Sequence, residues 1–104
     1  MANGIQKLRR EAFVRQGGLC FYCNCPMVDG DTRSFRKCTA EHLVARSDGG
    51  SNNASNVVAA CRYCNQTRHK RKQPLSPEHF RKMVQKRLDV GRWHGISRRR
   101  AKGP

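Results

Sequence analysis

Two Cys-x2-Cys pairs constrain the fold of this sequence more than any other feature: Cys20 with Cys23, and Cys61 with Cys64. The chain has 104 residues, 37% of them hydrophobic, which is enough for one small domain with a modest core. Such domains are usually stabilised by disulfides or by a metal ion. Four thiolates on two tight turns match the tetrahedral, all-sulfur preference of structural Zn²⁺. We therefore predict a zinc site that supports the fold and, being saturated by sulfur, takes no part in catalysis.

The choice between metal and disulfides depends on the compartment. The first residues, MANGIQKLRREAF, contain no uninterrupted apolar segment typical of a secretion signal, and no run approaches the roughly 18 apolar residues of a membrane span. We therefore expect a cytoplasmic protein, in which paired cysteines bind metal more often than they form disulfides. Cys25 and Cys38 are interpreted as buried small residues or free thiols, although Cys25 can compete as a ligand because it follows Cys23 so closely.

The charge of the chain indicates its partner. Lys and Arg number 22 against 7 Asp and Glu, which gives a formal net charge of +15. Basic groups that neutralise phosphates release condensed counterions, so an excess of this size is typical of a nucleic-acid binder. A solvated basic surface and a protein bound to anionic membranes are the alternatives. No segment has the pattern of a basic amphipathic membrane anchor, so we expect DNA as the partner and no membrane.

Hydrophobic periodicity predicts an α+β fold with a helix at each end of a single domain spanning 1–104. Apolar residues at near-helical spacing predict a helix over 4–16, followed by two glycines. A second helix is predicted over 76–90, because Ser76 is a favourable N-cap and Pro77 a favourable first residue. The tail, 95–104, is too basic and too poor in apolar residues to fold alone, and we expect it to be disordered.

The zinc knuckles and the segment between them form the predicted core, residues 20–73. A loosely alternating pattern within 35–45 indicates a strand, and the short apolar segment 56–60 indicates a second one. The polar stretch SDGGSNNASN between them is a loop, and a helix is expected to begin near Cys64.

Four polar residues within this core suggest a catalytic site. On a helix Asn65 and His69 lie one turn apart on one face, and that face can cover the end of the first strand, which carries Glu41 and His42. Glu41, Asn65 and His69 would form an incomplete, water-rich ligand set for a divalent cation. His42 would remain free to accept a proton from water, as phosphodiester hydrolysis requires. Taken singly, each residue is more often an ordinary surface, loop or cap residue, and strand alternation sends Glu41 and His42 to opposite faces unless the strand is bent.

The run AEHLVARSDGGSNNASNVVAACRYCNQTRHK, residues 40–70, resembles the motif of the HNH endonucleases. It has an acid-His pair, a Gly-Gly loop, an Asn before an apolar strand, then Cys-x2-Cys-Asn and a basic helix. With the first knuckle the resemblance covers about half of the chain, and it is nearest to the compact stand-alone HNH proteins of bacteria and their phages. The resemblance implies a ββα-metal unit, in which a hairpin packs on a helix around one divalent ion.

Carried over by position, the resemblance makes His42 the general base and Asn56 the residue that braces the loop and so orients His42. Glu41 becomes a metal ligand, with a backbone distortion at the Glu41-His42 pair that lets both side chains reach the site. Asn65 and His69 both stand at metal-site positions, and which of them is the principal ligand stays open. Two oxygen ligands and one imidazole favour Mg²⁺ or Mn²⁺ over a soft metal.

We therefore expect a metal-dependent endonuclease that nicks or cleaves DNA, in a bacterial or phage-infected cell. Cations around the site are predicted to bind phosphates on either side of the scissile bond: Arg62, Arg68, Lys70, Arg71 and Lys72. The alternative is a non-catalytic zinc-knuckle module that only binds nucleic acid, for which Asn56 and His69 would have no use. A homodimer and partners in phage packaging or restriction are compatible with the motif and stay open.

Overall fold

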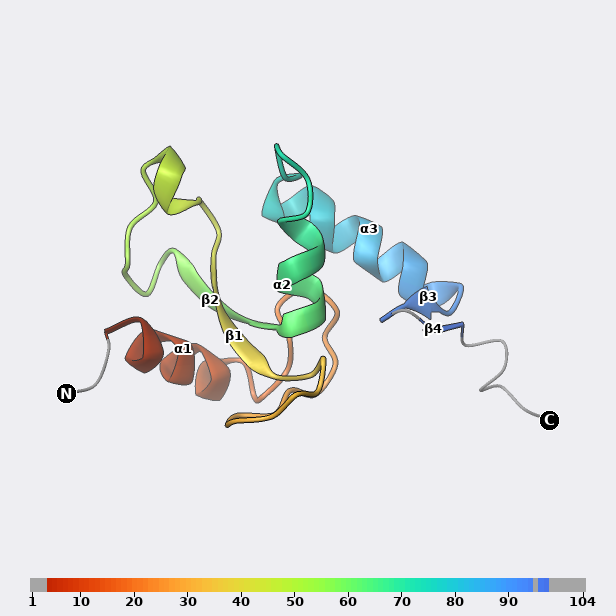
Figure 1. The fold of residues 1–104 in the computed structure, drawn as a ribbon, viewed down its shortest axis with the longest axis horizontal. Coiled ribbons are helices and arrows are strands. Elements are labelled where there is room, and N and C mark those ends of the chain that lie inside the picture. The colour runs from red at the N-terminus through yellow and green to blue at the C-terminus, as the bar shows by residue number, and fades with distance from the viewer. Residues whose placement is uncertain (1–3, 95, 98–104) are drawn as a thin grey trace.

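The computed structural model of the protein describes residues 4–94 and 96–97. It has a small α+β fold, as predicted, in which the described residues form a central two-stranded hairpin with helices α1 and α2 against it and a third helix, α3, farther along the chain (Figure 1). The elements follow in the order α1 (Gly4–Arg15), β1 (Cys38–His42), a 3-10 helix η1 (Arg46–Asp48), β2 (Val57–Cys61), α2 (Arg62–Arg68), α3 (Pro77–Asp89), β3 (Arg92–Trp93) and β4 (Ile96–Ser97).

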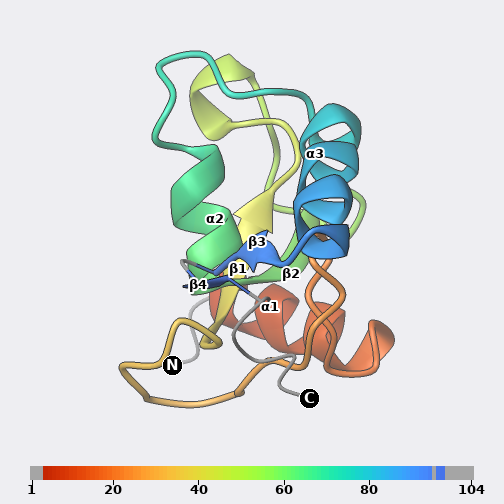
Figure 2. The same cartoon turned by 90° about the vertical axis from the view of Figure 1, so that its right-hand side faces the viewer.

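The hairpin of β1 and β2 is the centre of the molecule. The strands pair antiparallel in an unbroken register from Cys38 opposite Cys61 to His42 opposite Val57. Helices α1 and α2 lie on opposite sides of the hairpin (Figures 1 and 2), and every residue of β2 is buried between them. A strand covered on both faces reads as a continuous apolar run, which is why the sequence VVAAC shows no alternation.

Helix α1 is attached to β2 through one polar side chain. The Gln16 amide group donates to the Ala59 carbonyl, and its oxygen accepts from the Ala59 N–H, at 2.8 and 2.9 Å. Just beyond Gln16 the chain turns through two left-handed glycines into the first cysteine knuckle. The helix is one residue shorter than the 4–16 predicted, and the left-handed glycines end it.

Helix α3 packs on the first knuckle rather than on the hairpin. The Ser76 hydroxyl caps the helix by accepting from the His79 N–H, and Pro77 occupies the first turn, as predicted. Its buried residue Phe80 meets the Tyr22 ring edge to face at 4.9 Å. Gln85 Nε2 donates to the Tyr22 carbonyl at 2.8 Å. The second half of the chain is thus held to the segment that carries Cys20 and Cys23.

After α3 the chain forms the short strands β3 and β4. Gly91, at φ 71°, supplies the left-handed turn that ends the helix, and Trp93 in β3 is buried against Phe80. Of the tail predicted to be disordered, residues 96 and 97 form β4, while residue 95 and residues 98–104 lie outside the described part of the chain. Within that part, no helix is long and apolar enough to cross a membrane.

Candidate active site and cysteine cluster

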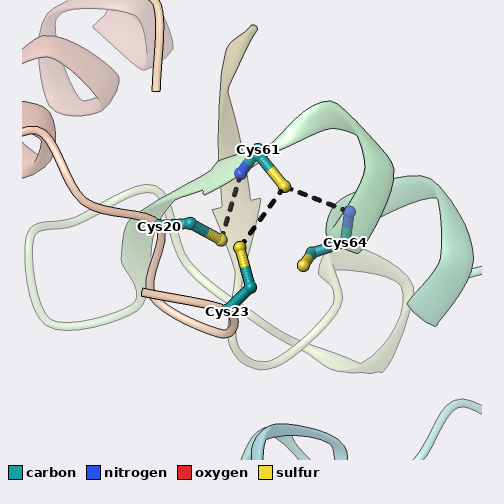
Figure 3. Close-up of side chains that lie close together, drawn as sticks. All are labelled: Cys20, Cys23, Cys61 and Cys64. Carbon is teal, nitrogen blue, oxygen red and sulfur yellow. Dashed lines mark hydrogen bonds between the residues drawn. The ribbon is translucent and has the colours of Figure 1, made fainter. Parts of the chain in front are cut away.

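The four cysteines of the two knuckles come together at the base of α2 (Figure 3). All four side chains are buried, and their sulfur atoms lie within 4.8 Å of one another. In the first knuckle the Asn24 N–H donates to the Cys20 carbonyl at 2.9 Å and closes the turn that carries Cys20 and Cys23. In the second, Cys61 ends β2 and Cys64 lies in the first turn of α2. The predicted sulfur cluster is therefore present, and its four donors suit a tetrahedral ion such as Zn²⁺.

Hydrogen bonds from N–H groups support the sulfur atoms of the cluster. Cys20 Sγ accepts from the Tyr22 and Cys61 backbone N–H groups at 3.4 and 3.3 Å, and Cys61 Sγ accepts from the Cys64 N–H at 3.4 Å. Trp93 Nε1 donates to Cys64 Sγ at 3.3 Å. A hydrogen bond from Cys23 lowers the pKa of Cys20 to about 7, and hydrogen bonds from Cys20 and Cys23 lower the pKa of Cys61. The hydrogen bonds within the cluster also raise the pKa values of Cys23 and Cys64, so without an ion only Cys20 and Cys61 favour thiolate, the form that binds a metal.

Glu41 is buried beneath α2 with both carboxylate oxygens in use. Its Oε2 accepts from Tyr22 Oη and from Arg68 Nη1, each at 2.8 Å, and its Oε1 lies 2.9 Å from His69 Nε2. Only 2% of the residue is exposed. Burial, together with the nearby Glu41 charge, raises the pKa of Tyr22, so the phenol keeps its proton and acts as a donor. The carboxylate is therefore fixed on one side and faces an imidazole on the other.

Arg68 does not lie on the surface with the other cations, so the prediction that it binds a phosphate is wrong. The residue is 6% exposed, and its guanidinium also donates to the carbonyl groups of His42, Leu43 and Leu75. The physical reason is its place on α2. Arg68 follows Cys64 by one helical turn, so it shares the inward face that carries the cluster cysteine.

Asn65 lies on α2 and His69 follows directly as its C-cap residue, and both side chains contact β1. Asn65 Nδ2 donates to Thr39 Oγ1 at 2.9 Å and to the Ala40 carbonyl at 3.2 Å. His69 caps the C-terminal end of α2, and 37% of its side chain is exposed. The structure therefore brings Glu41 and His69 together and anchors Asn65 to the same strand. Among the described residues Asn65 Oδ1 accepts no hydrogen bond, so this oxygen can act as a metal ligand.

His42 ends β1, and its side chain contacts the loop between the strands. Its Nε2 lies 2.6 Å from Oδ1 of Asn52 in the loop between the strands. The pairing of β1 with β2 continues regularly through Glu41 and His42, so the backbone distortion expected at this pair is absent. Glu41 and His42 therefore follow strand alternation and have different partners.

Asn56 holds the loop that follows His42. Its Oδ1 accepts from the Val44 N–H at 2.8 Å, and its Nδ2 donates to the carbonyl groups of Val44 and Ser51 at 3.0 and 2.9 Å. The loop also passes very close to its own backbone at Gly50. A Cβ atom added there would overlap the Val44 carbonyl oxygen. The loop is thus fixed by a nearly buried amide and by a glycine that no larger residue can replace without moving the backbone.

A pocket of about 490 Å³ opens beside His69, between the loop after His42 and the segment after α2. Arg71 and Lys72 line it, and Lys70 next to them is also exposed. Arg62 lies apart from them at the start of α2, where its guanidinium donates to the Arg33 carbonyl. The predicted phosphate-binding cations are therefore divided: three are solvent-accessible near His69, and Arg62 and Arg68 are engaged with the protein.

Three residues of the site could not be assigned from the pattern alone. The spacing of Arg68 from Cys64, one helical turn, indicates the inward face of the helix. Because Arg68 also stands in a run of cations, it was predicted to bind phosphate with them. Tyr22 lies in a knuckle, and nothing in its position indicates a bond to Glu41. Asn52 is one of several asparagines in a polar loop, and only the folded loop shows which of them reaches His42.

Comparison with known proteins agrees with this geometry. The family described as HNH endonuclease matches residues 19–71, which is about half of the chain. A CRISPR-associated endonuclease Cas9 from Actinomyces naeslundii is 36% identical over 62 residues, covering 59% of this chain and only 5% of the relative. No solved structure is a significant match. The matched segment contains both knuckles, β1, β2, α2 and the residues around Glu41 and His42. The chain therefore belongs to the HNH endonuclease family.

Proposed function

We propose that this protein is a divalent-metal-dependent DNA endonuclease in which His42 activates the attacking water. The observation that carries the proposal is the position of Asn56. A nearly buried amide makes three hydrogen bonds to the backbone of the loop that begins one residue after His42. A module that only binds nucleic acid gains nothing from such a fixed loop, whereas a general base has to be held in place to act.

The contact with Asn52 defines which nitrogen of His42 can act as the base. Asn52 Oδ1 can only accept, so Nε2 must carry the proton and donate across the 2.6 Å contact. Nδ1 then has the free electron pair and can take a proton from water. The same hydrogen bond would stabilise the imidazolium that forms when the proton has been transferred.

The residues around Glu41 fit a hard divalent ion such as Mg²⁺ or Mn²⁺. Glu41 Oε1, Asn65 Oδ1 and His69 Nε2 supply two oxygens and one nitrogen, a set that leaves positions for water and phosphate. When bound, such an ion supplies charge stabilisation for the phosphate and the leaving oxygen. Arg68 and Tyr22 keep Glu41 Oε2 occupied, so this carboxylate has a single oxygen to offer.

The cysteine cluster has a different part in the proposal. We infer that it holds Zn²⁺ as a structural ion, because four sulfurs leave no position for substrate. It joins the first knuckle to the β2–α2 junction and so holds α2 against the strand that carries Glu41 and His42. The exposed cations Lys70, Arg71 and Lys72 would bind the phosphates of the DNA backbone next to His69.

Incubation with supercoiled plasmid tests the proposal. The purified protein should nick or linearise the plasmid in the presence of Mg²⁺ or Mn²⁺, and not with EDTA. Binding of the same plasmid, measured in parallel without a divalent ion, separates cleavage from association. Tight binding with no cleavage under any of these conditions would identify a zinc-knuckle module that only binds DNA.

A further inference from the structure

A second group of metal-binding side chains lies beside the four-thiol cluster and shares one cysteine with it. Cys23, Cys25 and His94 place two sulfur atoms and a ring nitrogen within 4.8 Å of one another. We propose that these three residues form an outer metal site, in which Cys23 bridges to the ion of the four-thiol cluster. The outer site would take a borderline or soft ion such as Zn²⁺.

The geometry of the first knuckle brings Cys25 to this position. Asn24 has a left-handed backbone at φ 60°, so the chain turns sharply between the two cysteines. Cys25 Sγ then lies 3.5 Å from the Cys23 carbonyl oxygen, on the same side as the cluster. Cys25 is only partly buried, whereas the four cluster cysteines are buried. A site that includes Cys25 is therefore reachable from solvent.

His94 is held in place from several directions, although its own backbone is unfavourable. It has φ 60°, which is uncommon for a residue other than glycine. Its ring stacks on Phe35 with the centroids 4.9 Å apart and meets the edge of Tyr63 at 5.5 Å. The ring nitrogen Nε2 is closed off from solvent and has no hydrogen-bond partner among the described residues. Buried polar atoms are normally satisfied, and a missing ion is one reason for an exception.

The chemistry of the three donors agrees with this assignment. Thiolate and imidazole together suit Zn²⁺, and three protein ligands leave its fourth position open to solvent. Four thiolates around one dication leave two negative charges uncompensated in the interior, which is costly. A second dication next to Cys23 would reduce this excess, since it adds two positive charges and needs only one further thiolate. The outer ion should be held more weakly, because only three residues bind it and one of them is shared.

Zinc titration of the intact chain tests the proposal without any measurement of nuclease activity. Protein that already holds its first equivalent is titrated with Zn²⁺ under reducing conditions against a chromophoric chelator. The parent protein should take up a second equivalent, bound at least tenfold more weakly than the first. Cys25→Ser and His94→Asn should each lose the second equivalent and keep the first. Asparagine suits position 94 because it tolerates a left-handed backbone better than most residues.

Cys38→Ser is the matched control, because Cys38 is a further buried cysteine that belongs to neither metal-binding group. It should leave both equivalents in place. Saturation of the parent protein at one ion per chain would overturn the proposal, whatever the variants do. So would a second equivalent that survives both substitutions, or a His94→Asn variant that binds the first ion more weakly, since His94 would then serve the four-thiol cluster.

Discussion

Arg68 Nη1 lies 2.8 Å from Glu41 Oε2, and both side chains are almost completely buried. This ion pair joins α2 to β1 directly beneath the candidate active site. Taking charges out of water is costly, so a buried pair is tolerated only when further hydrogen bonds complete it. Tyr22 on Glu41 and three backbone carbonyls on Arg68 provide them. The pair fixes the carboxylate with its second oxygen toward His69.

A double-mutant cycle should show that the two residues are coupled. Arg68→Met or Glu41→Gln alone removes one partner and leaves the other unpaired, and each is expected to cost about 3 kcal/mol or more of unfolding free energy. The double variant should lose less than the sum of the two by about 1 kcal/mol or more. Urea unfolding of the zinc-loaded proteins measures this. Simple additivity would show that the contact has no energetic role.

The salt dependence of DNA binding should separate Arg71 from Arg68. Arg71 is exposed beside the pocket next to His69, whereas Arg68 is engaged with Glu41. If Arg71 contacts a phosphate, Arg71→Ala should reduce the slope of log K against log salt by about 0.9 for duplex DNA. Arg68→Met should leave the slope unchanged even if the protein is less stable. A reduced slope for Arg68→Met would contradict the buried position.

Asn56→Asp should disturb the loop after His42 while the zinc cluster stays intact. Aspartate keeps an oxygen for the Val44 N–H but has no N–H to donate to the carbonyls of Val44 and Ser51. We expect a loss of about 1–3 kcal/mol of stability and at least a tenfold loss of cleavage, measured by urea unfolding and plasmid nicking. Gln66→Glu is the control, because it makes the same amide-to-acid change at an exposed position of α2, and it should behave like the parent. Unchanged cleavage by Asn56→Asp would remove the main support for the proposed function.

Removal of the structural ion should loosen the whole domain, and the single tryptophan can report it. Trp93 is buried and donates to Cys64 Sγ, so its emission should shift to longer wavelength when a zinc-selective chelator is added. Metal binding requires thiolates, so protons compete with Zn²⁺ for all four cysteines. Zinc should therefore be released more readily as the pH falls. Equal chelation rates at pH 6 and pH 8 would contradict this account.

The elements that follow local rules could be predicted from the sequence. The periodicity of α1, the Ser76 cap with Pro77, and the apolar run of β2 all appear where the pattern indicates them. The two Cys-x2-Cys pairs also meet as expected, because each knuckle is a local turn and four sulfurs have one compact arrangement. The helices, β2 and each single knuckle depend on residues that are close together in the chain, whereas the meeting of the two knuckles could be predicted from the preference of zinc for four thiolates.

The contacts that could not be predicted join distant segments. Glu41 was expected to bind a metal, but the pattern does not show that Tyr22 and Arg68 also bond to it. The sequence pattern indicates no partner for His94, since its position next to Cys23 and Cys25 depends on how α3 and β3 return to the first knuckle. In a chain with 22 basic residues, the sequence pattern does not distinguish the buried Arg68 from the exposed cations. Burial, unlike helix spacing, is set by the whole fold.

The central claim, that His42 is the general base, is tested most directly by cleavage with saturating protein. His42→Ala should cut supercoiled plasmid on the order of 10²–10⁴-fold more slowly than the parent with Mg²⁺ or Mn²⁺, the range typical of general bases. Its DNA affinity and zinc content should be unchanged, and His79→Ala, which alters an exposed histidine of α3, should cut at the parental rate. Equal cleavage by His42→Ala and the parent protein would contradict the account.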